Sequence, residues 1–399
     1  MPTHTTDHFI NGARPRPPTR TRSSSGYRRP LRARMSRLAA AAAVAAIPLV
    51  MVTAPADAAG RRVVHPGESI QAAIDAARPG ATIRVAPGTY HESIIIATDG
   101  VTLVGSGPDK THIRPPAQAN DPCAAEHFGV CIFGQFDENF NLVRPVNDVR
   151  VSNLSVSGFT SVDQTGETVG VGVFILGGHN TTVDHVVAAD NGVFGFTSIL
   201  SSGDRYLHDT AYNNGFAGFQ IAGEHGAAVV TAGRDYRLQH VVAYDNRFGI
   251  VVHAASGGVV VDADLHDNCL GAMFSGPDTS DWEMKHTELH NNNRLCDALP
   301  GGDPAISGGG VAILGADHIT IRHNTVTANR PQAESAFAGG IIVGSTPTPG
   351  GDRPSNNITV TNNEAEGNAP ADIVWDGTGT AISFTRNDCA TSTPGELCN

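Results

Sequence analysis

Titratable and aromatic side chains gather in three stretches of the sequence, and each stretch directly follows a short apolar segment. The stretches are 223–235 (GEHGAAVVTAGRD), 254–258 (AASGG) and 276–285 (GPDTSDWEMK), which follow GFQIA, GIVVH and GAMFS. If the apolar segments are equivalent strands of neighbouring repeats, the stretches lie on one rim, because insertions in a repeat protein gather on one face. A span of about 15 Å, or three strand spacings, would then hold these side chains: Gln220, Glu224, His225, Arg234, Asp235, His253, Asp278, Asp281 and Trp282.

Such a rim fits proton transfer on an acidic sugar. Arg234 would neutralise the substrate carboxylate, or a Ca²⁺ ion held by Asp278 and Asp281 would do so, since Ca²⁺ prefers oxygen ligands. His253 would remove the proton at C5 as a general base, and His225 would complete the transfer. These roles describe a polysaccharide lyase or epimerase, and the sequence indicates no cofactor other than this candidate Ca²⁺.

The remaining side chains of the rim would bind the sugar, the last of them by stacking on a pyranose face: Glu224, Gln220 and Trp282. A glycoside hydrolase is the less favoured enzyme class. It needs two carboxylates that flank the scissile bond, and Glu224 or Asp235 opposite Asp278 or Asp281 would form that pair.

A repeat underlies the three stretches. Asn recurs at intervals of 22–24 residues, lengthened where insertions fall: Asn191, Asn214, Asn246, Asn268, Asn292, Asn329 and Asn368. The residue eight positions before each Asn is apolar, and the one six positions before it is polar: His185, His208, His240, Asp262, His286, His323 and Asn362. Repeats of this length predict a solenoid.

Each repeat contains strands of only three to five residues with bends between them, which predicts one coil of a parallel β-helix. Alternation along the second strand places one column on the core face: Val173, Phe196, Phe219, Ile250, Ala272, Val311, Ile341 and Ile373. Asn suits the bends, because it tolerates a left-handed backbone. We interpret the His column as stacked bend residues rather than as a metal site or proton relay.

These repeats resemble a known family. HITIRHNTVTANR (318–330) and NITVTNNEAEGN (357–368) are similar to the repeats of right-handed parallel β-helix proteins of the pectate-lyase-like superfamily, and GESIQAAIDAARPGATIRVAPGTYHESIII (67–96) is similar to their N-terminal cap. The resemblance covers roughly 62–388 and implies an all-β solenoid with a short capping helix. It transfers no catalytic residue, because the sequence lacks the Asp-Pro-His-Glu run of alginate epimerases and the signatures of pectin methylesterases and polygalacturonases.

The start of the chain indicates export. Residues 1–34 form a basic extension that is disordered or precedes the true start, and 35–58 resemble a signal peptide with an Ala-x-Ala cleavage site. The predicted order is then a cap with the first coils (60–115), a Cys-bearing insertion (116–145), the β-helix repeats (146–388) and a C-terminal tail (389–399). The insertion shows no strand repeat of its own, and we expect it to cover the apolar outward side of the second strands.

Charge and cysteine content restrict the partners. The first 58 residues carry nine Arg and two Asp, so the rest of the chain has a net charge of −19, which disfavours nucleic acid. We expect a polysaccharide partner, no membrane insertion and a monomer. In an exported chain, six Cys favour disulfides between nearest neighbours: Cys123–Cys131, Cys269–Cys296 and Cys389–Cys398.

The sequence therefore predicts a secreted, extracellular protein that processes a polysaccharide as a lyase or epimerase. The alternative is a non-catalytic carbohydrate-binding or cell-surface β-helix protein. A third interpretation is an accessory protein that docks a partner on the apolar outward side of the second strands.

Overall fold

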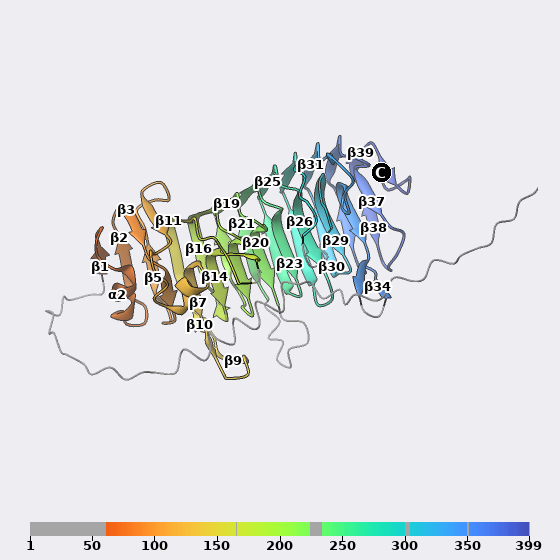
Figure 1. Ribbon diagram of the computed structural model, residues 1–399. Helices are drawn as coiled ribbons and strands as arrows, with labels where there is room; N and C mark the ends of the chain where they lie inside the picture. The colour runs from red at the N-terminus through yellow and green to blue at the C-terminus, as the bar shows by residue number, and fades with distance from the viewer. Residues whose placement is uncertain (1–60, 165, 224–233, 300–303, 349–350, 399) are drawn as a thin grey trace, which may run out of the picture.

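The computed structural model describes residues 61–164, 166–223, 234–299, 304–348 and 351–398. The basic extension and signal peptide predicted for 1–58 lie outside these residues, as do Glu224 and His225. The described chain is an elongated stack of coils that forms a parallel β-helix (Figure 1). None of its helices has the length and apolar character needed to cross a membrane.

The front sheet contains one strand from each coil. Its eleven strands pair in parallel in chain order: β4 (Ile94–Ile96), β7 (Phe128–Phe133), β14 (Val171–Leu176), β17 (Phe194–Ile199), β20 (Ala217–Ala222), β23 (Phe248–His253), β26 (Leu270–Ser275), β29 (Gly309–Leu314), β32 (Gly339–Gly344), β37 (Ile373–Trp375) and β40 (Ser392–Thr393).

The back sheet has 21 strands in two rows, and β11 (Arg150–Ser157) and β16 (Thr182–Ala189) run through both. The rest of the first row is β1 (Arg61–Val64), β2 (Thr82–Val85), β5 (Thr102–Val104), β18 (Arg205–Leu207), β21 (Tyr236–Gln239), β24 (Ser256–Val261), β27 (Ser280–Lys285), β30 (Asp317–Arg322), β35 (Thr359–Thr361) and β38 (Ser383–Thr385). The second row is β3 (Gly88–His91), β6 (Thr111–Arg114), β19 (Thr210–Tyr212), β22 (Val242–Tyr244), β25 (Asp264–His266), β28 (Glu288–His290), β31 (Thr325–Thr327), β36 (Glu364–Glu366) and β39 (Asp388–Cys389).

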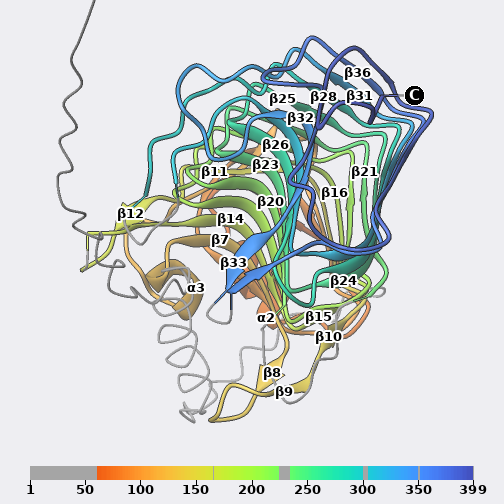
Figure 2. The same cartoon turned by 90° about the vertical axis from the view of Figure 1, so that its right-hand side faces the viewer.

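Short hairpins and bridges project from the coils. They are β8 (Gln135–Phe136) with β9 (Leu142–Arg144), β10 (Val146–Asn147) with β15 (Gly178–His179), β12 (Ser161–Val162) with β13 (Thr168–Val169), and β33 (Thr346–Thr348) with β34 (Gly351–Arg353). Seen along the axis, β12 and the β8–β9 hairpin extend beyond the coils on either side of β7 and β14 (Figure 2). These projections border the outer face of the front sheet.

The core fills the space between the sheets, as the sequence alternation predicts. The column of inward residues that runs from Val173 to Ile373 is fully buried. The rings of Phe196 and Phe219 stack with their centroids 4.8 Å apart. Because each coil adds one slice to a continuous apolar column, the core depends on stacking rather than on any single contact.

The predicted capping helix is present as α2 (Ile70–Asp75), at the N-terminal end of the stack (Figure 1). Ser69 is its N-cap, and the Ser69 hydroxyl oxygen accepts a hydrogen bond from the Ala72 amide at 3.1 Å. Ile70, Ala73 and Ile74 are buried against the first coils. The helix therefore shields the end of the core from water.

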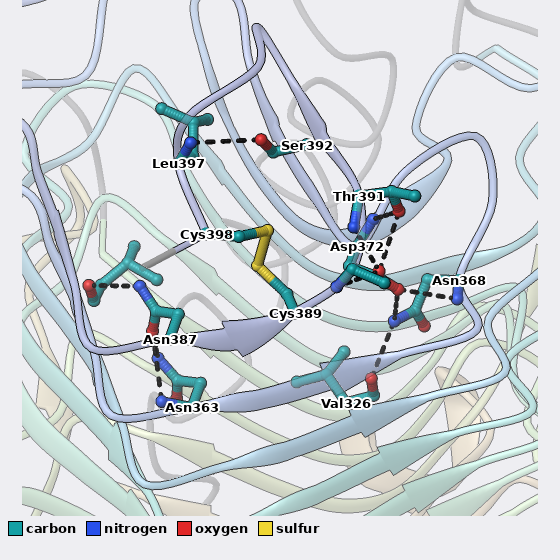
Figure 3. Close-up of a disulfide and its surroundings, with 12 residues drawn as sticks. Val326, Asn363, Asn368, Asp372, Asn387, Cys389, Thr391, Ser392, Leu397 and Cys398 are labelled. Carbon is teal, nitrogen blue, oxygen red and sulfur yellow. Dashed lines mark hydrogen bonds between the residues drawn. A yellow bond between two sulfur atoms is a disulfide. The ribbon is translucent and has the colours of Figure 1, made fainter.

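The repeated Asn residues form a buried ladder. Each Asn side chain donates its Nδ2 proton to Oδ1 of the Asn one coil further on, at 2.9–3.1 Å. The ladder ends at Asp372, whose Oδ1 accepts from both the amide and Nδ2 of Asn368 (Figure 3). It connects successive bends through the interior of the molecule.

One detail of the bend prediction is wrong: the ladder Asn residues are not the left-handed ones. The residue just before each of them has a positive φ, as in Asp190, Asn213 and Asp267. The His column is left-handed as well, with φ of 55° at His185. The ladder position is instead selected for a side chain that both accepts and donates hydrogen bonds inside the coil.

The Cys-bearing segment 116–145 differs from the prediction, because it does contain a repeat strand. Its β7 pairs in parallel with β4 and β14, and it also holds helix α3 (Pro122–Ala125). The Phe128 ring of β7 lies 4.9 Å from that of Phe174, so the segment covers the apolar outer face at its N-terminal end. The later apolar outward positions, including Val251 and Leu314, are buried in the same cluster.

The three disulfides are the nearest-neighbour pairs expected from the sequence. They join Cys123 to Cys131, Cys269 to Cys296, and Cys389 to Cys398. The last pair ties the C-terminal segment to β39, and β40 continues the front sheet (Figure 3). The segment predicted as a tail therefore still contributes to the coils.

Candidate functional site

The structure divides the predicted rim between two faces of the molecule. Gln220 and His253 lie on the outer face of the front sheet, on the adjacent strands β20 and β23. Asp235 and Asp281 lie beyond the bend and line a hollow on the back sheet. Glu224 and His225 fall in the undescribed segment 224–233.

The outer face of the front sheet carries a polar patch near its middle. The hydroxyl of Thr197 donates to Oε1 of Gln220 at 2.7 Å, one coil further on. His253 is half-buried, and its Nδ1 lies 3.3 Å from the hydroxyl oxygen of Ser275 on β26. The patch spans four neighbouring strands from β17 to β26.

Apolar side chains border the patch on both sides. Toward the N-terminus the outward positions hold Phe174 and Leu176, and toward the C-terminus they hold Leu314 and Ile342. Within this patch Gln220 and His253 are half-buried, whereas Thr197 and Ser275 are buried, so Gln220 and His253 are the polar groups that a ligand could contact.

A glycine makes room for the imidazole. Gly276 follows Ser275 with a φ of +84°, and a Cβ built there would lie 2.6 Å from Cε1 of His253. Any other residue at 276 would push the ring away and would be strained in the left-handed region. The position of His253 therefore depends on the first residue of the stretch 276–285.

Arg234 and Asp278 lie on the bends between the two faces. Arg234 is exposed, and its carbonyl oxygen accepts a hydrogen bond from the Gly203 amide at 2.7 Å. Asp278 has a left-handed backbone, and its neighbour Thr279 accepts from the Ala254 amide at 2.7 Å. The described residues of these stretches thus follow neighbouring strands of the front sheet, while their side chains serve two faces.

The prediction that Trp282 stacks on a sugar is wrong. Its side chain is 1% exposed, and its Nε1 donates to the Ala255 carbonyl at 3.0 Å. The indole stacks on the Tyr236 ring, with centroids 5.9 Å apart. Along β27, Asp281 points outward, whereas Trp282 and Met284 point inward. The alternation of polar and apolar residues in SDWEMK therefore predicts that Trp282 is buried.

Two arginines that the sequence analysis missed also line the hollow. Arg205 on β18 and Arg237 on β21 are paired in register, so they stack in neighbouring coils. Each stands nine positions before a ladder Asn, Asn214 and Asn246 respectively. The repeat register could therefore have found them.

The described residues hold two groups that could bind a metal ion. One consists of Asp184, His185 and His208, and the other of Asp264, Glu288 and His290. In the first group the two imidazoles stack at 4.6 Å, and Nδ1 of His185 lies 2.7 Å from Asp184. Neither group includes Asp278 or Asp281, and the Ca²⁺ site proposed for that pair stays a prediction.

Two fully buried carboxyl groups lie where β17 and β18 meet the core. Burial raises the pKa of Asp204 to about 7, although its Oδ1 accepts from the Thr181 amide and its Oδ2 from the Ser198 hydroxyl. Burial also raises the pKa of Asp209 well above its ordinary value. Both groups face the interior and cannot contact a substrate on either face.

Two family models match the chain. The model described as "Right handed beta helix region" matches residues 209–350, and the one described as "Protein of unknown function (DUF1565)" matches residues 56–264. The comparison with curated proteins gives no match. The second model spans more than half of the 399 residues.

Solved structures share the fold. The A-module of mannuronan C-5 epimerase AlgE4 from Azotobacter vinelandii aligns with a TM-score of 0.54 and 20% identity, over 84% of this chain and 94% of that one. The DFA-IIIase of Arthrobacter chlorophenolicus A6, in complex with GF2, aligns with a TM-score of 0.57 and 13% identity, over 82% and 88%. The chain is a right-handed parallel β-helix protein, and it belongs to the family described as "Protein of unknown function (DUF1565)".

Proposed function

We propose that this protein is secreted and acts on an extracellular acidic polysaccharide at the front-sheet patch, with His253 as the general base. The observation that carries the proposal is the place of His253. Among the outward positions of the described front-sheet strands it is the one imidazole. It pairs in register with Ala222 and Ser275, while Gln220 lies two positions along on the adjacent strand β20 and Thr197 lies beyond it on β17. An imidazole titrates near neutral pH and suits proton transfer.

The chemistry proceeds by loss of the C5 proton of a uronate unit. The hydroxyl oxygen of Ser275 can accept the Nδ1 proton of His253, and in that tautomer the unprotonated Nε2 accepts the C5 proton. In a lyase the electron pair forms a C4–C5 double bond, the C4–O bond breaks, and the leaving oxygen takes up a proton. In an epimerase a second group returns a proton to the opposite face of C5.

Three further roles are assigned from the sequence. Arg234, on the rim beside the patch, would neutralise the substrate carboxylate, or Ca²⁺ on Asp278 and Asp281 would do so. His225 is the sequence-based candidate for the second proton-transfer group. Gln220 would donate hydrogen bonds to sugar hydroxyls through its amide.

The solved structures that share the fold support this class of function. One is named a mannuronan C-5 epimerase and another a DFA-IIIase in complex with GF2. A long sheet face bordered by projecting hairpins also suits an extended polymer (Figure 2). The lyase and epimerase chemistries share the first proton transfer and differ only in the step that follows it.

The test compares wild type, His253→Ala and His185→Ala on a panel of uronate polysaccharides. Elimination is read from the ultraviolet absorbance of unsaturated products, and epimerisation from proton NMR of the sugar composition. Removing the base should lower turnover about 10²–10⁴-fold while leaving binding nearly intact. His185 lies on the back-sheet bend, so its variant should keep full activity.

Full activity of the His253→Ala variant would contradict the proposal. If the wild type binds a glycan but converts none of the panel, the non-catalytic carbohydrate-binding alternative replaces the enzymatic one.

A further inference from the structure

We infer that the hollow on the back sheet is a second glycan site, which binds the carboxylate of an acidic sugar unit through Arg205 and Arg237. The hollow has a volume of about 550 Å³ and lies on the outer face of strands β18, β21, β24 and β27. It is separated from the front-sheet patch by the bend between the two sheets. The inference therefore does not depend on His253 or on catalysis.

The two arginines lie opposite each other on neighbouring strands. Arg205 and Arg237 are partners in the β18–β21 register, so their Cα atoms are about 4.8 Å apart, one strand spacing. No ion pair joins either of them to a carboxylate within the part of the chain that the structure describes. Like charges directly opposite each other destabilise a sheet unless an anion lies between them.

Two other arginines on the same sheet face are neutralised. Arg150 pairs with Asp184, and Arg322 pairs with Glu283. The Nε of Arg237 donates to Oε1 of Gln239 at 2.8 Å, which orients the guanidinium and leaves its terminal amino groups for a ligand. In a chain with a net charge of −12, two arginines opposite each other on neighbouring strands are a local concentration of positive charge.

The hollow lies where β24 has a glycine on its outward side. Gly257 has a φ of +73° and lies between Asp235 of the preceding coil and Asp281 of the following one. On the inward side, a Cβ on Gly258 would lie 2.5 Å from the indole of Trp282, so the buried Trp excludes any larger residue there. The missing side chain at Gly257 therefore leaves space on the outer face.

The lining specifies an acidic sugar. Two stacked guanidinium groups bind a planar carboxylate through parallel, charge-assisted hydrogen bonds. Asp235 and Asp281 accept hydrogen bonds from hydroxyl groups. A uronate unit offers one carboxylate beside several hydroxyls, whereas a polyanion without hydroxyls would be repelled by the two carboxylates of the hollow.

The experiment measures affinity for short oligogalacturonates and oligomannuronates by calorimetry on the exported chain. Each of Arg205→Gln and Arg237→Gln should weaken binding about tenfold, since a hydrogen bond between charged groups contributes that order. Val259→Phe, which fills the hollow from β24, should weaken binding as well. Arg322→Gln is the matched control, because Arg322 lies on the same face but already has a partner, and its affinity should not change.

Ligand and site controls complete the test. Methyl-esterified oligomers and inorganic sulfate should bind at least tenfold more weakly than the free uronates, because one lacks the charge and the other the sugar hydroxyls. Affinity for the hollow should be unchanged in His253→Ala, so failure of the proposed catalysis and failure of this site are distinguishable. Unchanged affinity in the Arg205→Gln/Arg237→Gln double variant, or equal binding of the methyl ester, would overturn the inference.

Discussion

Asp204 is fully buried, and this makes the stability of the fold depend on pH. Burial raises the pKa of Asp204 to about 7, whereas an unfolded Asp titrates near 4, so the folded state retains the proton over that range. The free energy of unfolding therefore decreases as pH rises from about 4 to about 7, by roughly 3–4 kcal/mol at most.

Asp204→Asn should remove this dependence. The Asn side chain keeps an acceptor for the Thr181 amide and offers a donor to Ser198, so the buried hydrogen bonds persist. Denaturant unfolding should show a clearly larger gain for the variant at pH 8 than at pH 5, because at pH 5 only the first part of the loss has occurred. The exposed Asp388→Asn is the control, and equal gains at both pH values would refute the explanation.

Single residues also show where sequence reasoning succeeds and where it fails. The alternation of inward positions identified the core column, because a period of two along a strand depends on the chain alone. The role predicted for Trp282 is wrong because the segment 276–285 was treated as a loop, although its residues 280–285 alternate as a strand does. The Arg205–Arg237 pair depends on residues 32 positions apart, and only the repeat register brings them together.

At the scale of an element, the Asn ladder is the feature on which each coil depends. Asn268 accepts from the amide and Nδ2 of Asn246, and it donates to Asn292 and to the Ala243 carbonyl. Truncation would leave several buried polar groups without partners, each at a cost of about 1–3 kcal/mol.

Asn268→Ala should therefore lower the free energy of unfolding by about 3 kcal/mol or more. Thermal and denaturant unfolding measure the effect, with the exposed Asn139→Ala as the control. A change of less than about 0.5 kcal/mol, the range of ordinary surface substitutions, would show that the ladder does not stabilise the fold.

The Cys269–Cys296 disulfide closes a loop of 27 residues that spans one coil. The chain-entropy model gives about 3–4 kcal/mol for a loop of that length. The Cys269→Ala/Cys296→Ala variant should lose stability of this order, and non-reducing peptide mapping of the wild type should recover the linked pair. Two free thiols there would contradict the disulfide.

The elements were predictable to different degrees. The strands, the bends and the capping helix follow from local patterns, so the sequence located them. The sequence analysis placed the left-handed backbone at the ladder Asn, one position after the residue that has it. An Asn at a bend suits both a positive φ and a hydrogen-bonded ladder, so only the backbone conformation distinguishes the two. The strand β7 was missed because its segment follows no Asn of the repeat.

For the whole molecule, we expect the fold to depend on its continuous apolar stack rather than on a metal ion. Treatment of the protein with a strong chelator should leave the far-UV circular dichroism rich in β-strand and the unfolding midpoint unchanged. Cooperative unfolding on chelation would show instead that a metal ion stabilises the coils.

The division of the rim between two faces could not be predicted at this scale. Three equivalent stretches indicate one edge of the solenoid, but a sharp bend turns side chains only a few residues apart toward opposite faces. His253 and Gly257 illustrate this, since one ends a front strand and the other lies in the hollow of the back sheet. The polar composition of the three stretches locates the edge of the solenoid, and the geometry of each bend decides toward which face a side chain points.

The Asn ladder has a direction, and its last member is of a different chemical kind. An amide side chain both receives and passes on a hydrogen bond, so it propagates the series in the way a bifunctional monomer extends a polymer. Asp372 only accepts, taking the protons of Asn368 on one oxygen and those of Ala390 and Thr391 on the other. A carboxylate at this point is a chain terminator: it closes the internal series at a defined number of units and offers nothing on which a further coil, or another molecule, could continue it.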